Sequence, residues 1–126
     1  MKNLILLISI SVALSCQQNK KIETIAVKQE ASIINPDISF GVRGNCGMCK
    51  TTIEKAALSV DGVEEASWSI TSKILDVKIA SNLDSIKIHE AIAKSGYDTE
   101  LILAVDENYN NLPGCCQYNR GMVINN

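Results

Sequence analysis

The sequence predicts an α+β domain in which strands and helices follow one another in the order β-α-β-β-α-β. Four short stretches are predicted as strands, and two of them, residues 37–42 and 73–80, alternate apolar and polar residues at period two, as half-buried strands do. Two longer stretches repeat apolar residues at helical spacing instead. Turn signals separate these stretches, and the 126 residues of the chain are enough for one such domain with tails.

The first half of the domain is predicted as a strand over residues 37–42 and a helix over residues 48–59. The strand places its apolar residues on one face, and the two glycines of "GNCG" end it. Asp61-Gly62 marks the turn after the helix. The helix repeats small and apolar residues at a spacing of three to four: Ile53, Ala56, Ala57 and Val60.

A hairpin and a second helix follow. The hairpin strands are predicted over residues 63–70 and 73–80, around the short loop "TSK". Asn82 or Asp84 can cap the second helix, which continues to about Lys94.

The last strand is predicted over residues 97–105, "YDTELILAV", after Gly96 at the helix C-terminus. The complete order is that of the split βαβ, or ferredoxin-like, sandwich. Two helices would cover one face of a four-stranded antiparallel sheet. We assign residues 37–105 to this domain.

Residues 1–16 have the pattern of a signal peptide. The apolar run from Leu4 to Leu14 is too short for a bilayer, which takes roughly 20 residues. Ser15 and Cys16 follow the run and resemble the lipobox of bacterial lipoproteins, which implies cleavage before a lipidated Cys16. Secretion with a different cleavage site is the alternative.

Two polar segments flank the domain: a flexible leader over residues 17–36 and a cysteine-containing C-terminal extension over residues 106–126. The signal peptide predicts an exported, periplasmic protein held to a membrane by a lipid anchor. In such an oxidising compartment, paired thiols can form disulfides. The 12 basic and 14 acidic residues include no Lys/Arg run, which excludes a nucleic-acid-binding protein.

Cys46 and Cys49 lie where the first strand gives way to the first helix. Thiolates there face the free N–H groups of a helix N-terminus, which lower the pKa of a thiol. Arg43 and Lys50 flank the loop and favour the thiolate in the same way. Two thiolates suit a soft ion such as Cu(I), whereas structural Zn(II) takes four ligands.

Three motifs in register resemble the heavy-metal-associated domain, the family of copper chaperones, copper-pumping ATPases and periplasmic mercury-binding proteins. They are "CGMC", "VDGVEEASWSI" and "IHEAIAKSGYDTEL", and the resemblance covers about residues 38–104. It implies that Cys46 and Cys49 are metal ligands and that Tyr97 lies in the loop beside the metal. It also implies Cu(I), or else Hg(II) or another soft ion, as the cargo.

One position departs from the family pattern. The family usually has Met two residues before the first cysteine, as an apolar plug beneath the metal loop, and this chain has Gly44. Met48 is expected to point outward and does not replace that plug. We therefore expect a looser loop than the family norm.

These features predict a carrier that binds Cu(I) and passes it on by thiolate exchange, and not an enzyme. The partner would be a metal-transporting ATPase, another metal-binding domain or a cuproprotein. A periplasmic mercury(II)-binding scavenger is the alternative of the same class.

A thiol-disulfide oxidoreductase is the alternative of another class, because C-G-x-C at a helix N-terminus also occurs in thioredoxins. Asn45 stands where thioredoxins usually place Trp, and Pro113 is the only proline after the motif. A disulfide that merely closes the two-residue loop would stabilise the fold weakly.

The extension carries a second pair, Cys115 and Cys116. If the last strand runs away from the metal loop, the tail must return over roughly 20 Å, and the chain from Ala104 to Cys115 reaches roughly 36 Å when extended. At most one of the two would then join the first pair as an additional metal ligand, and the sequence does not distinguish them. A disulfide within the tail or between molecules, or a free pair on the surface, is the alternative.

Two other residues have structural interpretations. His89 is predicted to be solvated or half-buried at the side of the second helix, rather than a ligand. Trp68 is predicted to pack in the core or at its edge, rather than to bind a partner.

Overall fold

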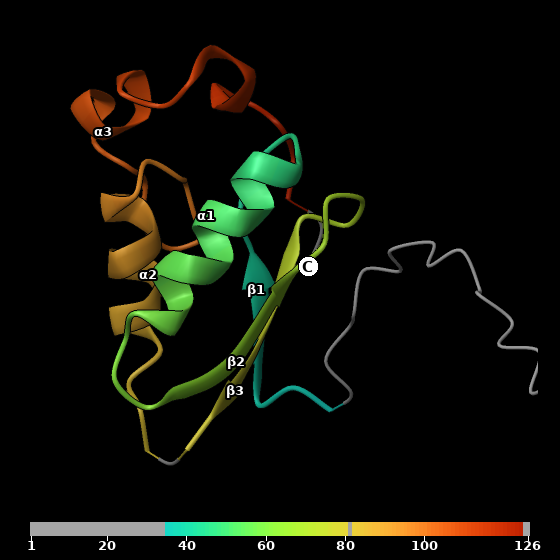
Figure 1. The fold of residues 1–126 in the computed structure, drawn as a ribbon, viewed down its shortest axis with the longest axis vertical. Helices are drawn as coiled ribbons and strands as arrows, with labels where there is room; N and C mark the ends of the chain where they lie inside the picture. Colours follow the sequence, from blue (N-terminus) through green and yellow to red (C-terminus); the bar gives the residue numbers. More distant parts are fainter. Residues whose placement is uncertain (1–34, 81, 125–126) are drawn as a thin grey trace, which may run out of the picture.

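The computed structural model describes residues 35–80 and 82–124, which form a sheet with helices packed on one face (Figure 1). The predicted signal peptide, Cys16 and nearly all of the leader lie outside the described residues. Within the described part of the chain, no helix is long and apolar enough to cross a membrane.

The described residues form one antiparallel sheet of three strands: β1 (Ile38–Gly41), β2 (Val63–Trp68) and β3 (Ile74–Ile79). The central strand is β3, and Phe40 of β1 and Trp68 of β2 both lie opposite its Leu75. These strands confirm the first three predicted strands, with ends that differ by two residues at most.

The two predicted helices are confirmed as α1 (Gly47–Leu58) and α2 (Ile86–Lys94). Each turns an apolar stripe toward the sheet, and Ile53 and Ile92 are fully buried there. Gly96 follows α2 with a φ of 102°, a left-handed conformation that suits glycine and ends the helix.

The fourth strand, predicted over residues 97–105, does not form. Thr99 makes one isolated antiparallel bridge to Val42, and the chain then turns, because the N–H of Thr99 donates to the carbonyl of Ile102 at 2.8 Å. The Thr99 hydroxyl also accepts from the N–H groups of Leu101 and Ile102, at 3.3 and 3.0 Å. A side chain that captures nearby N–H groups in this way competes with a sheet ladder.

His89 is buried, so the prediction of a solvated or half-buried side chain is wrong. Only 2% of it is exposed, its ring lies 3.8 Å from that of Phe40, and its Nδ1 lies 2.8 Å from the Thr99 hydroxyl. That hydroxyl donates to the Ile102 carbonyl, so it accepts the Nδ1–H of a neutral imidazole. Burial lowers the pKa of His89, against a smaller opposing effect of Glu100.

The C-terminal tail packs into the domain and is not a detached extension. It contains α3 (Asp106–Asn110) and a 3-10 helix, η1 (Gly114–Cys116), and it passes over the N-terminal end of α1 (Figure 1). Cys116 and Tyr118 are buried members of the core cluster. Because the chain turns over residues 99–102, the tail already lies at this end of the domain, and the long predicted return does not occur.

Candidate metal centre

Cys46 and Cys49 lie at the junction between β1 and α1, as the sequence predicts. Cys46 is the N-cap residue of α1 and has an extended backbone, with φ −144° and ψ 178°. Cys49 lies in the first turn and is fully buried, whereas Cys46 is partly exposed. Both thiols are free, and their Sγ atoms lie 3.4 Å apart. Two sulfurs this close can bind one ion together.

The helix N-terminus favours the thiolate form of Cys46. The backbone N–H of Cys49 lowers the pKa of the Cys46 thiol, and the Cys49 side chain and the Met48 N–H act in the same direction, while burial opposes them. The N–H of Asn45 points at the second sulfur, 3.4 Å from Cys49 Sγ. The backbone of the loop and first turn therefore supplies the donors to both sulfurs.

The two cations that flank the loop, Arg43 and Lys50, make hydrogen bonds to other parts of the domain, and the effect predicted for them on the thiols stays a prediction. Arg43 donates through Nε to the carbonyl of Met122 at 2.9 Å. Lys50 donates to Glu54 at 2.6 Å and to the carbonyl of Trp68 at 2.5 Å. Arg43 therefore ties the C-terminal tail to the loop, and Lys50 ties β2 to the start of α1.

A third thiol comes from the tail. Cys116 Sγ lies 3.9 Å from Cys46 Sγ, and the sulfurs of Cys46, Cys49 and Cys116 all lie within 4.8 Å of one another. Burial raises the pKa of the Cys116 thiol to about 12. Cys115 is exposed instead, with its Sγ 3.7 Å from Met48 Sδ. The structure thus shows which of the two tail cysteines lies next to the first pair: it is Cys116 and not Cys115, a choice that the sequence left open.

Tyr97 lies beside the sulfurs, where the family resemblance implied a Tyr. Its side chain is fully buried, and its hydroxyl has no hydrogen-bond partner among the described residues. Burial raises its pKa above the usual range, and its neighbours Cys49 and Cys116 raise it further. The phenol is therefore a neutral donor group facing two sulfur atoms.

Trp68 packs beneath the metal loop, where the family Met is missing. A Cβ built on Gly44 would lie 3.0 Å from the Trp68 ring and 3.2 Å from Cys49 Cβ. The indole is fully buried, and its Nε1 donates to the carbonyl of Val42 at 3.0 Å. The Trp68 ring therefore supports the loop from the core side, and the expectation of a looser loop than the family norm stays a prediction.

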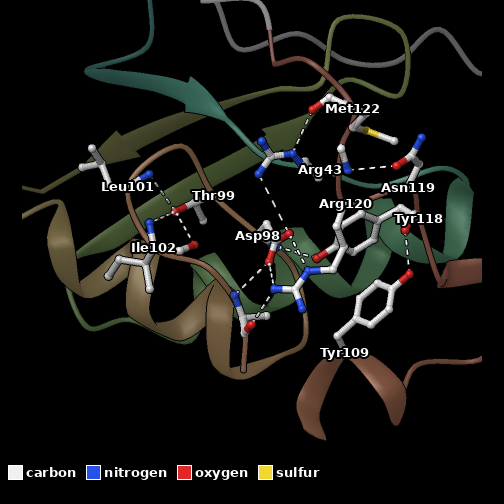
Figure 2. Close-up of polar contacts among 12 residues, drawn as sticks. Arg43, Asp98, Thr99, Leu101, Ile102, Tyr109, Tyr118, Asn119, Arg120 and Met122 are labelled. Carbon is white, nitrogen blue, oxygen red and sulfur yellow. Dashed lines mark hydrogen bonds and ion pairs between the residues drawn. The ribbon is translucent and has the colours of Figure 1, made fainter. Parts of the chain in front are cut away.

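An ion pair between the partly exposed Arg120 and the buried Asp98, at the base of the tail, has no signal in the sequence. Arg120 donates to both carboxylate oxygens of Asp98, at 2.9 and 2.7 Å (Figure 2). It also donates to Asp106 at 2.8 Å. Asp98 is 1% exposed, and Arg43 approaches it from the other side at 3.9 Å. The loop before α1 and the C-terminal tail therefore share one carboxylate.

Comparison with known proteins agrees with this site. Residues 44–98 match the model of the family described as "Heavy-metal-associated domain". The chain contains a heavy-metal-associated domain. Both Cys46 and Cys49 lie within the matched residues, and the tail cysteines lie outside them.

A curated relative of the heavy-metal-associated domain is Copper-transporting ATPase 1 of Rhizobium meliloti (strain 1021). It is 35% identical over 60 residues, which are 47% of this chain but 7% of that ATPase. A solved CopZ metallochaperone is 30% identical, with a TM-score of 0.47, over 49% of this chain and 96% of that one. A chain solved under the description "Crosstalk between Cu(I) and Zn(II) homeostasis" is 18% identical, with a TM-score of 0.44, over 50% of this chain and 96% of that one.

Proposed function

We propose that this protein is a soft-metal-ion carrier that binds Cu(I) through Cys46 and Cys49 and passes it on by thiolate exchange. The observation that carries the proposal is the pair of free thiols with Sγ atoms 3.4 Å apart at the N-terminus of α1. Thiolates are soft ligands and favour Cu(I) over harder ions. The family match over both cysteines and the similarity to copper proteins support the same ion.

The unequal exposure of the two cysteines gives the exchange a direction. Cys46 is partly exposed and Cys49 is fully buried, so a thiolate of the partner approaches the ion from the Cys46 side. It adds to the bound ion, so that thiolates of both proteins hold the ion together, and the bond to Cys46 then breaks. A further partner thiolate replaces the cysteine ligation that remains, and the released sulfurs of this chain regain protons from the solvent.

The partners and the location belong to the same proposal. The similarity of this chain to a segment of a copper-transporting ATPase supports three kinds of receiver for the ion: a metal-transporting ATPase, another metal-binding domain or a cuproprotein. The apolar run that ends at Ser15-Cys16 supports export to the periplasm and a lipid anchor. Mass spectrometry of the mature protein should find an acylated Cys16 at the N-terminus; an unacylated chain that begins elsewhere would refute the anchor.

Competition titrations of the reduced protein with Cu(I), Hg(II) and Zn(II) test the function. We expect tight one-to-one binding of Cu(I), much weaker binding of Zn(II), and loss of tight Cu(I) binding in Cys46→Ser and in Cys49→Ser. Cys115→Ser is the matched control, because this exposed thiol lies outside the three-sulfur group. Strong preference for Hg(II) would favour the scavenger. A protein that binds no soft ion but reduces a disulfide substrate would be an oxidoreductase.

A further inference from the structure

We propose that Cys116 is a third ligand of the bound ion and that the C-terminal tail is a strap that closes over the site. The strap is residues 113–122. The inference rests on the proposed function, because it concerns the ion held by Cys46 and Cys49. Its starting observation is the Cys116 Sγ, which lies 3.9 Å from Cys46 Sγ in a group of three sulfurs that spans no more than 4.8 Å.

The strap is fixed on both sides of Cys116. On one side, the N–H of Cys116 donates to the carbonyl of Pro113 at 2.7 Å, which closes the turn of η1. On the other, the buried Tyr118 hydroxyl donates to the carbonyl of Gly96 at 3.0 Å and accepts from the N–H of Asp98 at 2.7 Å. The sulfur of Cys116 is thus positioned by the fold and does not depend on a chance approach of a mobile tail.

An ion pair with the buried Asp98 carboxylate fixes the end of the strap. Arg120 binds both oxygens of Asp98 and also donates to the carbonyl of Ala104 at 2.6 Å (Figure 2). Two residues after Arg120, the carbonyl of Met122 accepts a hydrogen bond from Arg43. Arg43 precedes Asn45 of the metal loop by two positions. The strap and the metal loop are therefore tied through groups that hold no metal.

The 3-10 turn decides which tail cysteine faces the ion. Cys116 is fully buried against the other two sulfurs, whereas Cys115 is exposed. Cys115 meets the loop through its backbone: its carbonyl lies 3.4 Å from Asn45 Nδ2 and 3.7 Å from Cys46 Sγ. The thiol of Cys115 lies outside the closed site, next to Met48 Sδ.

The hydroxyl of Tyr97 gives an independent reason to expect metal-bound thiolates at this site. A buried hydroxyl without a partner loses free energy unless something accepts its hydrogen. The neighbours of this hydroxyl are the sulfurs of Cys49 and Cys116. Metal-bound thiolates are good acceptors, so the phenol suits a loaded site that includes the tail sulfur.

X-ray absorption of the full chain loaded with one equivalent of Cu(I), in a buffer without added thiols, tests the inference. We expect three sulfur ligands in the unmodified protein and in Cys115→Ser, the control one position away. We expect two in Cys116→Ser and Cys116→Ala, with an affinity for Cu(I) lower by about tenfold or more in both.

The outcomes separate this inference from the function on which it rests. Two sulfurs in the unmodified protein would overturn the strap, and this count needs no variant that could misfold. Three sulfurs in both Cys116 variants would also overturn it. Failure of the function is a different result: the unmodified protein would bind no Cu(I) tightly, or would bind it equally well in Cys46→Ser and Cys49→Ser.

Discussion

The indole ring of Trp68 occupies the space beside Gly44, so close that a Cβ at position 44 would lie 3.0 Å from the ring. The same ring belongs to the buried core cluster that includes Cys49, and it is fixed by a hydrogen bond to the carbonyl of Val42. A large side chain from β2 therefore supports the metal loop from below, and a glycine above it makes room.

Gly44→Ala should destabilise the domain by about 1–3 kcal/mol, because the added methyl group overpacks the contact with Trp68. Gly47→Ala is the matched control. A Cβ at Gly47 meets nothing within 4 Å, so its free energy of unfolding should stay the same or rise. Urea denaturation of both variants measures the difference. Equal stabilities would show that the ring does not limit position 44.

Arg120→Ala should lower the free energy of unfolding by about 1–3 kcal/mol, because it leaves the buried Asp98 carboxylate short of its main partner. It should also weaken Cu(I) binding without removing any sulfur, because it loosens the strap. Lys94→Ala, which removes an exposed cation from α2, should change stability by no more than about 0.5 kcal/mol.

A double variant sharpens this prediction. Asp98→Asn with Arg120→Ala should be less destabilised than the sum of the two single variants, because both charges of the pair are then removed. Urea denaturation and chelator competition give the two readouts. An Arg120→Ala protein with unchanged stability and unchanged Cu(I) affinity would refute the role of this ion pair.

His89 should make the domain less stable as the pH falls below about 6.5. Burial places the pKa of His89 in the folded state below its usual value of 6.5. The unfolded chain therefore binds more protons in this range, so stability is lost on acidification, by up to about 1.4 kcal/mol for each pH unit. Urea denaturation between pH 7.5 and about pH 5 should show a shallower dependence in His89→Gln. Parallel curves for the two proteins would contradict this.

The sequence predicts those parts of the fold in which side-chain periodicity decides the structure. In α1 and in α2, apolar residues repeat at helical spacing. Ile53 belongs to the repeat of α1 and Ile92 to that of α2, and both are buried as predicted. The strand predicted over residues 97–105 does not form. There, Thr99 binds two nearby N–H groups and Asp98 binds a third, from Ala104 at 2.9 Å. Such local capture of the backbone leaves no periodic signal.

The candidate site was predictable only in its local part. Cys46 and Cys49 lie three positions apart, and their placement at a helix N-terminus follows from the neighbouring pattern. Cys116 lies 70 positions from Cys46, and its approach depends on the turn after Thr99 and on the pair between Arg120 and Asp98. Neither of these long-range relationships follows from spacing in the sequence.

Native mass spectrometry of the reduced protein with one equivalent of Cu(I) tests the central claim most directly. The account predicts one added copper ion per chain in the unmodified protein, and none in the Cys46→Ser/Cys49→Ser double variant. The double variant keeps Cys115 and Cys116, so it also shows whether the tail alone holds the ion. One copper ion per chain in the double variant, or none in the unmodified protein, would contradict the account.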